Sequence, residues 1–359
     1  MIPQTITCRE SAGFSPALRP EYSPRIVALG GGHGLSNLLR GLKSYTKNLT
    51  AIVTVADDGG GSGMLRRDLG MPAPGDIRNC MQALSNTEPL MERLLDYRFT
   101  EGTLQGQSFG NLLLAALNGI SSSFDEAVSG MQQVLAITGR VLPVTADNVQ
   151  LAALLENGAR VVGESKIARA KQEENCRIRQ ISLLPPDPTA LPGAISAIEE
   201  ADLILLGPGS LYTSLIPNLL VPGIAEAIRR THVPRIYVSN LMTQEGETEG
   251  YTVADHIDAL YAHSGPGLFT ACLVNSDSIP PHLLRNAWEA GGITPVTLDQ
   301  TRVTTLGLEL IACPLVSLDA DVICHCPHCL TQAIRAIYES RAIQVYPDRP
   351  GRRYVLETD

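Results

Sequence analysis

Residues 25–40 read RIVALGGGHGLSNLLR, and this stretch decides the fold. An apolar run ends in glycines and then resumes at helical spacing, which predicts a buried strand, a tight turn and a helix. Glycines permit positive φ in such a turn and leave no side chain between the backbone N–H groups and a ligand. The first turn of a helix has unpaired N–H groups and a partial positive charge. We therefore expect a phosphate site at Gly30, Gly31, Gly32, His33, Gly34 and Asn37.

The composition is that of a globular protein with room for a large core. The chain has 359 residues, 44% of them hydrophobic and 18% charged, so one large α/β domain is expected. A net charge of -9 argues against a nucleic-acid partner, because phosphate backbones require clustered Lys and Arg. We expect no membrane span, because no apolar run reaches about 18 residues. The N-terminus has no apolar signal core, which predicts a cytoplasmic protein.

A second glycine-rich loop follows the second predicted strand. Residues 49–55 form a β-branched run, and ADDGGGSGMLRR follows at 56–67. Ligands of open α/β sheets bind outside the carboxyl ends of the strands, so this loop is expected to face the same ligand. The alternative is a solvated surface loop, which four glycines beside two acids make entropically costly. The predicted roles are Mg²⁺ or ribose binding by Asp57 and Asp58, and phosphate binding by Gly59, Ser62 and Gly63.

Two more helix starts in the first third carry polar residues. Asp76 follows Pro74-Gly75 at the position of an N-cap, with Asn79 on the next turn. Helix capping alone is the structural alternative for Asp76. Ser108 and Asn111 open a helix that then becomes apolar. These residues are expected to converge on the site.

The sequence divides into an extension, one domain and a tail. We expect residues 1–24 to be a flexible N-terminal extension, residues 25–340 a single domain and residues 341–359 a peripheral tail. Runs at 149–155 and 159–162 flank a hairpin signal, and 178–184 adds a strand. The fold class predicted is therefore α/β, a Rossmann-like, doubly wound, mostly parallel sheet with a small antiparallel lobe inserted at about 141–190. The acids of this lobe, including Glu164 and Glu173, are expected to be solvated.

A second glycine corner repeats the logic of the first. Residues 202–206 form a buried strand, and GPGSLYTS follows at 207–214. The next predicted strand, 234–240, ends in Asn240, with Thr243 just beyond it. This pattern predicts a second phosphate or sugar site. Its residues are Gly207, Gly209, Ser210, Thr213, Ser214, Asn240 and Thr243.

Two C-terminal features have competing interpretations. The lone Trp288 lies on a predicted helix, where packing is the ordinary role and a nucleobase platform the functional one. Residues 324–329 read CHCPHC. Five ligands in six residues cannot all reach one tetrahedral zinc ion, so we favour the start of the last helix over a metal site.

Six motifs in order resemble one family. GGGHGLS, ADDGGGSGMLR, PGDIRNC, SFGNL, GPGSLYTS and SNLMTQEGET, spread over about 25–340, resemble the YvcK family. These gluconeogenesis factors are relatives of the 2-phospho-L-lactate transferase (CofD) enzymes. The resemblance implies a cytoplasmic protein that binds UDP-N-acetylglucosamine and supports cell shape and wall synthesis during gluconeogenic growth. It also implies a wall-synthesis protein as partner, and a homo-oligomer is a further expectation.

The resemblance also assigns single residues. In the Mg²⁺-assisted transferases the matching carboxylates are on the metal side, which would be Asp57 and Asp58 here. The family commonly has Arg-His-Asp where this chain has Cys324-His325-Cys326, so only His325 carries over. An Arg at that place would be a phosphate partner. Trp288 lies near the position of a family aromatic that stacks on uracil.

Three functions follow from these patterns and from what the resemblance implies. The first is a regulator that binds UDP-N-acetylglucosamine across the glycine corners. The second is a Mg²⁺-dependent transferase acting on a nucleotide-activated substrate, which needs positioning and charge neutralisation more than a nucleophile. The third, a dehydrogenase, is weaker, because the spacing of Gly30, Gly32 and Gly34 is not the dinucleotide fingerprint. We therefore expect no NAD.

Overall fold

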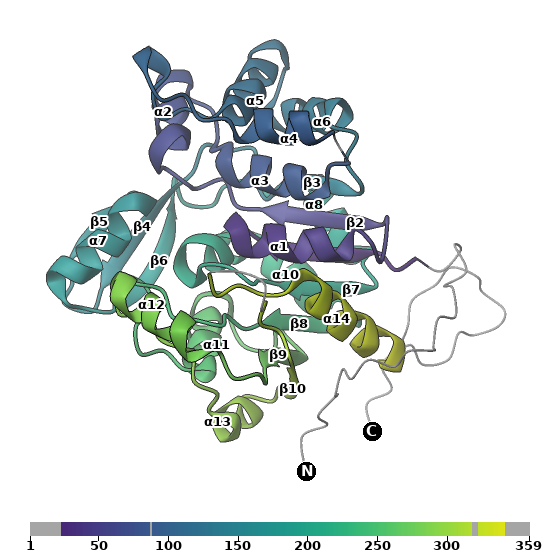
Figure 1. Cartoon of the computed structure of the whole chain (residues 1–359), viewed down its shortest axis with the longest axis vertical. Helices are drawn as coiled ribbons and strands as arrows, with labels where there is room; N and C mark the ends of the chain where they lie inside the picture. Colours follow the sequence, from purple (N-terminus) through teal and green to yellow (C-terminus); the bar gives the residue numbers. More distant parts are fainter. Residues whose placement is uncertain (1–22, 87, 318–321, 342–359) are drawn as a thin grey trace.

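The fold is built on one parallel sheet of seven strands (Figure 1). The computed structural model describes residues 23–86, 88–317 and 322–341, so most of the predicted extension and tail lies outside the described residues. The strand order is β10-β9-β8-β7-β1-β2-β3, and every adjacent pair is parallel. The strands are β1 (Ile26–Gly30), β2 (Leu49–Val53), β3 (Arg140–Pro143), β7 (Leu203–Leu206), β8 (Arg235–Val238), β9 (Ala271–Asn275) and β10 (Glu309–Cys313).

The sheet is doubly wound, as predicted. The chain starts at β1 in the middle, moves outward through β2 to β3, and returns to β7 on the other side of β1. It then moves outward in the opposite direction through β8, β9 and β10. The topological switch point therefore lies between β1 and β7, which is where open α/β sheets bind their ligands.

Helices cover both faces of the sheet. On one face α1 (Gly32–Leu42) lies between α3 (Gly75–Leu84) and α14 (Pro327–Arg341), and contacts both (Figure 1). Gly41 allows the close approach of α1 to α14, because a Cβ there would collide with the carbonyl oxygen of Pro327. The other face carries α8 (Pro192–Glu199), α9 (Ile216–Leu220), α10 (Ile224–Arg230) and α11 (Val253–Ser264).

Two further helices contact the edge strands of the sheet, α6 (Phe124–Val134) with β3 and α13 (Gln300–Thr305) with β10. The other helices of the described residues are α2 (Gly60–Leu69), α4 (Pro89–Asp96), α5 (Phe109–Ile120), α7 (Glu164–Glu174) and α12 (Pro281–Gly291). Two short turns are also helical, the 3₁₀ turn Gly102–Leu104 and the π-helical turn Leu211–Leu215.

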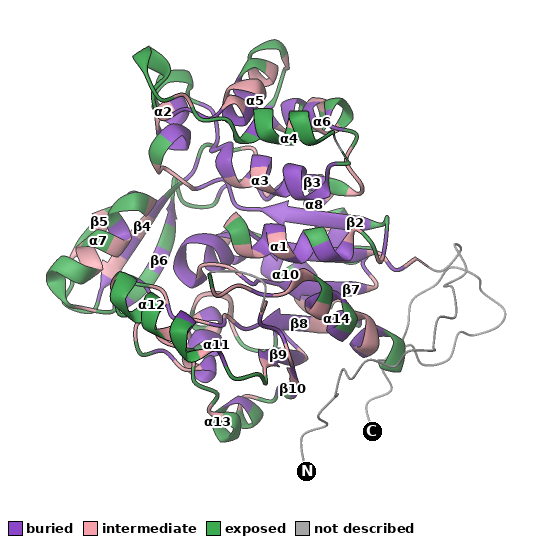
Figure 2. Cartoon of the chain, viewed as in Figure 1, coloured by how far each residue is buried: buried purple, intermediate pink, exposed green. Residues whose placement is uncertain are grey.

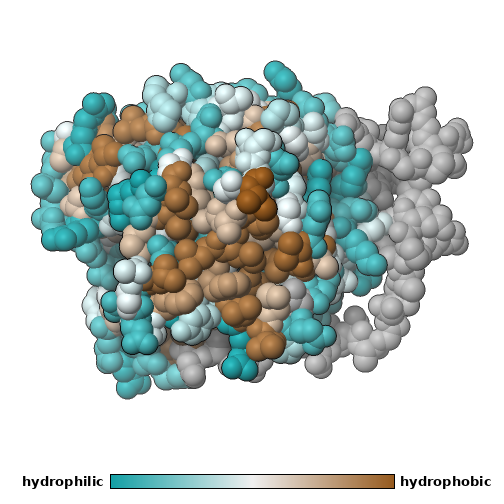
Figure 3. All heavy atoms as spheres, turned by 90° about the horizontal axis from the view of Figure 1, so that it is seen from above, coloured by the Kyte–Doolittle hydropathy of each residue, from teal (hydrophilic) through white to brown (hydrophobic). Residues whose placement is uncertain are grey.

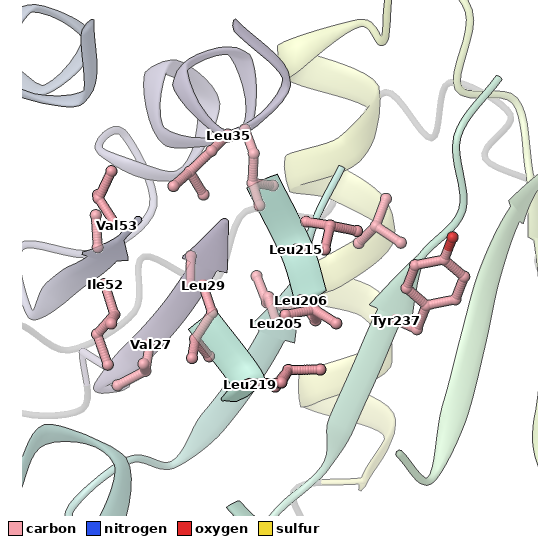
Figure 4. Packing of buried hydrophobic residues seen from close by; sticks show 14 of the residues in the cluster. Val27, Leu29, Leu35, Ile52, Val53, Leu205, Leu206, Leu215, Leu219 and Tyr237 are labelled. Atoms are coloured by element: carbon pink, nitrogen blue, oxygen red, sulfur yellow. The ribbon is translucent and has the colours of Figure 1, made fainter. Parts of the chain in front are cut away.

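The core is aliphatic, as the low aromatic content predicts. All residues of β1 and β2 are buried, in agreement with strands covered on both faces (Figure 2). Leu35 and Leu215 lie on one side of β1, while Val27 and Leu29 point to the other side, toward Leu219 (Figure 4). This rigid centre holds the β1 and β7 turns in place.

The predicted antiparallel lobe is present but shorter than expected. It is a three-stranded sheet in the order β5-β4-β6, formed by β4 (Gln150–Leu155), β5 (Arg160–Val162) and β6 (Ile178–Leu184). Arg140–Pro143 does not belong to it, because this strand pairs with β2 in the main sheet. The lobe also contains α7. Hydrophobic periodicity does not predict this helix, because a single residue of it, Ile167, is buried.

One face of the molecule is unusually apolar. Hydrophobic residues gather on the side that carries α4 and α5 (Figure 3), where Leu90 is 71% and Ile120 84% exposed. In the described part of the chain no single helix has the length and apolar character needed to cross a membrane. The bent pair Leu211–Leu220 with Ile224–Arg230 meets those criteria only when its two helices are taken together.

Candidate functional site

A cleft of about 830 Å³ opens at the carboxyl ends of β1, β7 and β8. The glycine turns after β1 and β7 form its floor, and the segment after β8 forms one side. Helix α12 and residues 322–325 close it. The cleft therefore lies at the switch point of the sheet. The predicted residues that line it are Gly31, Gly32, His33, Gly34, Asn37, Gly209, Ser210, Ser214, Asn240, Thr243 and His325.

The two glycine turns touch each other. A Cβ on Gly34 would lie 2.5 Å from the carbonyl oxygen of Pro208, so only glycine permits this approach. Gly32 has a φ of +61°, which favours glycine for a second reason. The N-cap residue of α1, Gly31, has no side chain to cap the helix, and Asp76 accepts the hydrogen bond of the first amide, at Gly32. The next amides of the first turn, at His33 and Gly34, face the cleft.

Two asparagines hold the turns in register. The buried Asn218 donates hydrogen bonds to the carbonyls of Gly30 (3.0 Å) and Ser214 (2.7 Å), which ties the end of β1 to the turn after β7. Asn240 donates to the carbonyl of Gly209 at 3.0 Å and accepts from its amide at 3.4 Å. The role of Asn218 was not foreseen, because it follows an apolar run and carries no local turn signal.

Some predicted hydroxyls are already engaged inside the protein. The hydroxyl of Thr213 donates to Glu247, and the hydroxyl of Thr243 accepts from the amide of Thr294. Thr213 is absent from the cleft wall, as are Gly30 and Gly207, which complete the two turns. Thr213, Gly30 and Gly207 therefore support the cleft wall without lining it.

Two buried polar atoms on the cleft wall lack a partner. His325 is 7% exposed, and its Nε2 makes no hydrogen bond, while its ring makes one to the backbone of Ser239. Burial lowers the pKa of His325 to about 4, so the ring is neutral at pH 7. Gln244 donates to Ser210 Oγ at 2.7 Å, which leaves its Oε1 buried and unpaired. A ligand that donates hydrogen bonds would satisfy both atoms.

The cleft carries no Lys, Arg, Asp or Glu among its described lining residues. An anionic ligand would therefore be held by backbone amides and the positive end of α1 rather than by side-chain cations.

Helix α12 supplies an apolar wall that sequence reasoning missed. Leu283, Ala287 and Ala290 face the cleft at helical spacing, together with Asn286. Trp288 lies on another side of the same helix, is 62% exposed and does not line the cleft. The structure therefore does not bring Trp288 to the site, and the face of α12 with small residues was the signal to follow.

The acidic loop after β2 lies outside the cleft wall. Asp58 accepts a hydrogen bond from the amide of Ser165 at 2.7 Å, so it caps the start of α7. Asp57 accepts from the amide of Gly59 at 2.8 Å, and its other oxygen lies near Gly75. The two carboxylates thus have different partners. Neither residue lines the cleft.

Asp76 connects the start of α1, which lines the cleft, with the acidic loop after β2. It lies in the first turn of α3. The sequence predicted that Asp76 is the N-cap of this helix, but the N-cap is Pro74. Its carboxylate accepts a hydrogen bond from the backbone of Gly32 at the start of α1. Burial, and then the charge of Asp57, raise the pKa of Asp76 to about 7.

Two acids outside the predicted set belong to the same neighbourhood. Burial and the charge of Asp57 raise the pKa of Glu164 to about 8, so the expectation of a solvated Glu164 is wrong. Glu247 is 5% exposed, and burial raises its pKa to about 7. Glu164 was misjudged because α7 was not predicted, and the fold turns its first residue inward.

The other predicted residues of the first third lie away from the cleft wall. Ser108 is the N-cap of α5 and accepts from the amide of Asn111. Asn79 accepts from Arg78 at 2.6 Å. Ser62 and Gly63 are buried in the first turn of α2, behind Gly59.

The CHCPHC segment begins the last helix, as favoured from the sequence. Helix α14 starts at Pro327, and Cys326 lies just before it. Among the described residues, no group of three or more His, Cys, Asp or Glu side chains is arranged to hold a metal ion.

The comparisons with known proteins agree with the fold. The family profile described as 2-phospho-L-lactate transferase CofD matches residues 26–316. A Bacillus subtilis protein named gluconeogenesis factor is 48% identical over 306 residues, which are 85% of this chain and 95% of that protein. A Thermoanaerobacterium thermosulfurigenes protein, provisionally given that name, is 50% identical over 88% of this chain and 97% of its own length. A crystal structure of a Bacillus halodurans protein superposes with a TM-score of 0.84 at 43% identity, covering 87% of this chain and 99% of that one.

Proposed function

Because the chain belongs to the 2-phospho-L-lactate transferase CofD family, and its near relatives are named gluconeogenesis factors, we propose that it is a nucleotide-sugar-binding regulator. The proposed ligand is UDP-N-acetylglucosamine, bound in the cleft between β1 and β7. The proposed role is control of cell shape and wall synthesis during growth on gluconeogenic carbon sources, in the cytoplasm.

The observation that carries this proposal is the uncharged cleft at the switch point. Its floor presents the first turn of α1 beside the turn after β7, and the amides that follow Gly32 in that turn suit a diphosphate. Its walls offer two unpaired buried atoms, Gln244 Oε1 and His325 Nε2. The uracil ring has an N–H donor, and a sugar has hydroxyl donors, so such a ligand supplies what both atoms lack. The apolar face of α12 suits the flat side of a base or sugar.

The test is a ligand-dependent shift in thermal unfolding. UDP-N-acetylglucosamine, UMP, GDP and NAD are compared, each with and without Mg²⁺. A ligand at 100 times its dissociation constant stabilises the folded state by about 2.7 kcal/mol. The proposal predicts a response to UDP-N-acetylglucosamine, and no response at millimolar concentration would overturn it.

A second function, a Mg²⁺-dependent transferase, is favoured by the acids beyond the cleft. Asp57 raises the pKa values of Asp76 and Glu164, so negative charge gathers there, although Arg66 and Arg78 lie close enough to act on these acids. Mg²⁺ commonly needs only one or two carboxylates with waters and substrate phosphates. Asp57 and Asp76 fit that role better than Asp57 with Asp58, because Asp58 caps α7. When bound, Mg²⁺ would neutralise the phosphate oxygens of a nucleotide-activated substrate.

This second function has its own test. Mg²⁺ is titrated into the protein in a calorimeter, with no nucleotide present. Metal held by Asp57 predicts heat of binding that Asp57→Asn removes and Asp68→Asn, an exposed change on α2, leaves intact. Equal heats for the two variants would count against it.

The partner expectations stay proposals. A regulator must pass its bound state to another protein, and we propose a protein of wall synthesis in this role. Light scattering of the full chain, with and without UDP-N-acetylglucosamine, tests for a homo-oligomer.

A further inference from the structure

The start of α14 carries two cysteines in a CxxC arrangement, Cys326-Pro327-His328-Cys329. Cys326 is the N-cap residue, because its carbonyl accepts the first helical hydrogen bond, from the amide of Leu330 at 3.0 Å. Both cysteines are thiols in the structure, and both are half-buried rather than sealed in the core. Paired cysteines at this spacing, at a helix start beside a parallel sheet, are typical of dithiol redox sites.

The two sulfurs are within bonding reach of each other. Cys326 Sγ accepts a hydrogen bond from the amide nitrogen of Cys329 at 3.4 Å. The Sγ of Cys329 is three bonds from that nitrogen, so rotation about its side chain brings it to Cys326. Residues three apart at a helix start have Cα atoms about 5 Å apart, which is inside the range that a disulfide needs.

Cys326 lies at the start of the 15-residue helix α14, and the amide of Cys329 points at its sulfur. A thiolate is the nucleophile in thiol–disulfide exchange.

The same segment forms part of the ligand cleft. Cys324 and His325 line the cleft, and His325 keeps its buried Nε2 unpaired toward a ligand. Cys326 is fixed behind them by a hydrogen bond from its amide to the carbonyl of Leu315 at 2.8 Å. A change at Cys326 is therefore one residue from the cleft wall.

We propose that Cys326 and Cys329 form a redox-active dithiol site that reacts with small disulfides of the oxidised glutathione type. The thiolate of Cys326 attacks one sulfur of the small disulfide and expels the other sulfur as a thiolate. The thiolate of Cys329 then attacks Cys326 Sγ and expels the second thiolate. The two protein thiols lose two electrons and two protons, and one small disulfide is reduced to two thiols.

The test counts thiols in the full chain at fixed ratios of oxidised to reduced glutathione. Remaining thiols are blocked with N-ethylmaleimide and the intact mass is measured, followed by fragmentation of the peptide that contains residues 324–329. The wild type is expected to lose two labels and gain a link between Cys326 and Cys329. Cys324→Ser and the matched control Cys176→Ser should keep this loss, whereas Cys326→Ser should abolish it.

Cys329→Ser gives a second check, because it should trap Cys326 as a mixed disulfide with glutathione. A wild type that stays fully labelled, a link that involves Cys324, or a two-label loss in Cys326→Ser would each overturn the proposal. Serine is close to isosteric with cysteine, and circular dichroism of each variant confirms folding.

The effect on the cleft rests on the proposed function and is measured separately. We expect the oxidised protein to bind UDP-N-acetylglucosamine at least about threefold more weakly than the reduced protein, because the disulfide displaces the residue beside His325. In Cys326→Ser the oxidant should leave affinity unchanged. If the reduced wild type binds no UDP-sugar, the proposed function fails while the thiol count still decides the dithiol site.

Discussion

The turn after β1 and the loop after β2 have similar sequences, but only the turn after β1 lines the cleft. Both follow buried strands and both are rich in glycine, yet Gly31–Gly34 line an open cleft and Asp57–Gly63 do not. The difference lies in the direction of the chain on either side of them. Connections from β1 and β7 leave toward opposite sides of the sheet, which opens a crevice between them. The start of α7 lies against the loop after β2, where Asp58 accepts a hydrogen bond from the amide of Ser165.

The two places also differ in charge. The cleft has no charged side chain among its described lining residues, while the loop after β2 joins Asp57, Asp76 and Glu164 in one acidic neighbourhood. An anion suits the first and a cation suits the second. A glycine-rich strand end is therefore not enough to identify a phosphate site, because the topology around it decides what it faces.

The largest expected effect comes from filling the contact between the two glycine turns. Gly34→Ala places a Cβ 2.5 Å from the carbonyl oxygen of Pro208, so the backbone of one turn must move. We expect a loss of about 2 to 4 kcal/mol in the free energy of unfolding, measured with urea, together with loss of UDP-sugar binding. The control is Gly119→Ala on α5, where a Cβ meets nothing, and a small gain in stability is expected. Equal effects of the two substitutions would contradict the close contact.

The acidic neighbourhood predicts a pH effect of the next size. The pKa of Asp76 is raised to about 7, so the folded chain holds a proton that the unfolded chain releases from about pH 4 upward. Its contribution to stability is therefore complete below about pH 4 and is lost as the pH rises to about 7. Asp76→Asn keeps an acceptor for Gly32 but cannot ionise. We expect the free energy of unfolding of this variant, relative to wild type, to rise by about 1 to 3 kcal/mol between pH 4 and 7.

Urea unfolding at several pH values checks this expectation. The exposed Asp68→Asn on α2 serves as the control, and its difference from wild type should stay flat with pH. A flat difference for Asp76→Asn as well would show that Asp76 is not buried against Asp57 and the start of α1.

A smaller effect is expected from adding an arginine to the cleft wall. Cys324→Arg adds a cation to a cleft whose described lining has none. A guanidinium beside a diphosphate should tighten binding of UDP-N-acetylglucosamine by about tenfold, or 1.4 kcal/mol, in isothermal titration. Cys324→Gln, which adds length without charge, should leave the affinity near that of wild type. Tightening by both variants would point to packing rather than charge.

Much of the fold was predictable from local patterns. The strands β1, β2 and β7 are short apolar runs, each followed within six residues by glycine, and their alternation with helices predicts a doubly wound sheet. Helix α7 was not predictable in this way, because its polar sequence has one buried residue, Ile167. The edge strand β3 was not predicted, and most of it fell within the range given for the lobe, because nothing local in Arg140–Pro143 tells which sheet it joins.

The site was predictable where it depends on backbone and less so where it depends on distant contacts. The glycine turns, Ser210, Asn240 and His325 do line the cleft. Adjacency in sequence suggested that Asp57 and Asp58 act together, but only the fold shows that Asp58 serves α7. Which face of α12 lines the cleft depends on how the helix is rotated about its axis, and local sequence does not give that rotation. Trp288 was therefore predicted as a site residue, whereas Ala287 is the one that lines the cleft.

Isothermal titration of UDP-N-acetylglucosamine into Asn37→Asp and Asp57→Asn tests the central claim most directly. Asn37 lines the cleft on α1, and its near-isosteric change to Asp places a negative charge where the diphosphate is proposed to lie. The account predicts at least about tenfold weaker binding for Asn37→Asp and affinity within about twofold of wild type for Asp57→Asn. Undiminished binding by Asn37→Asp, with loss in Asp57→Asn, would contradict it and move the ligand to the loop after β2.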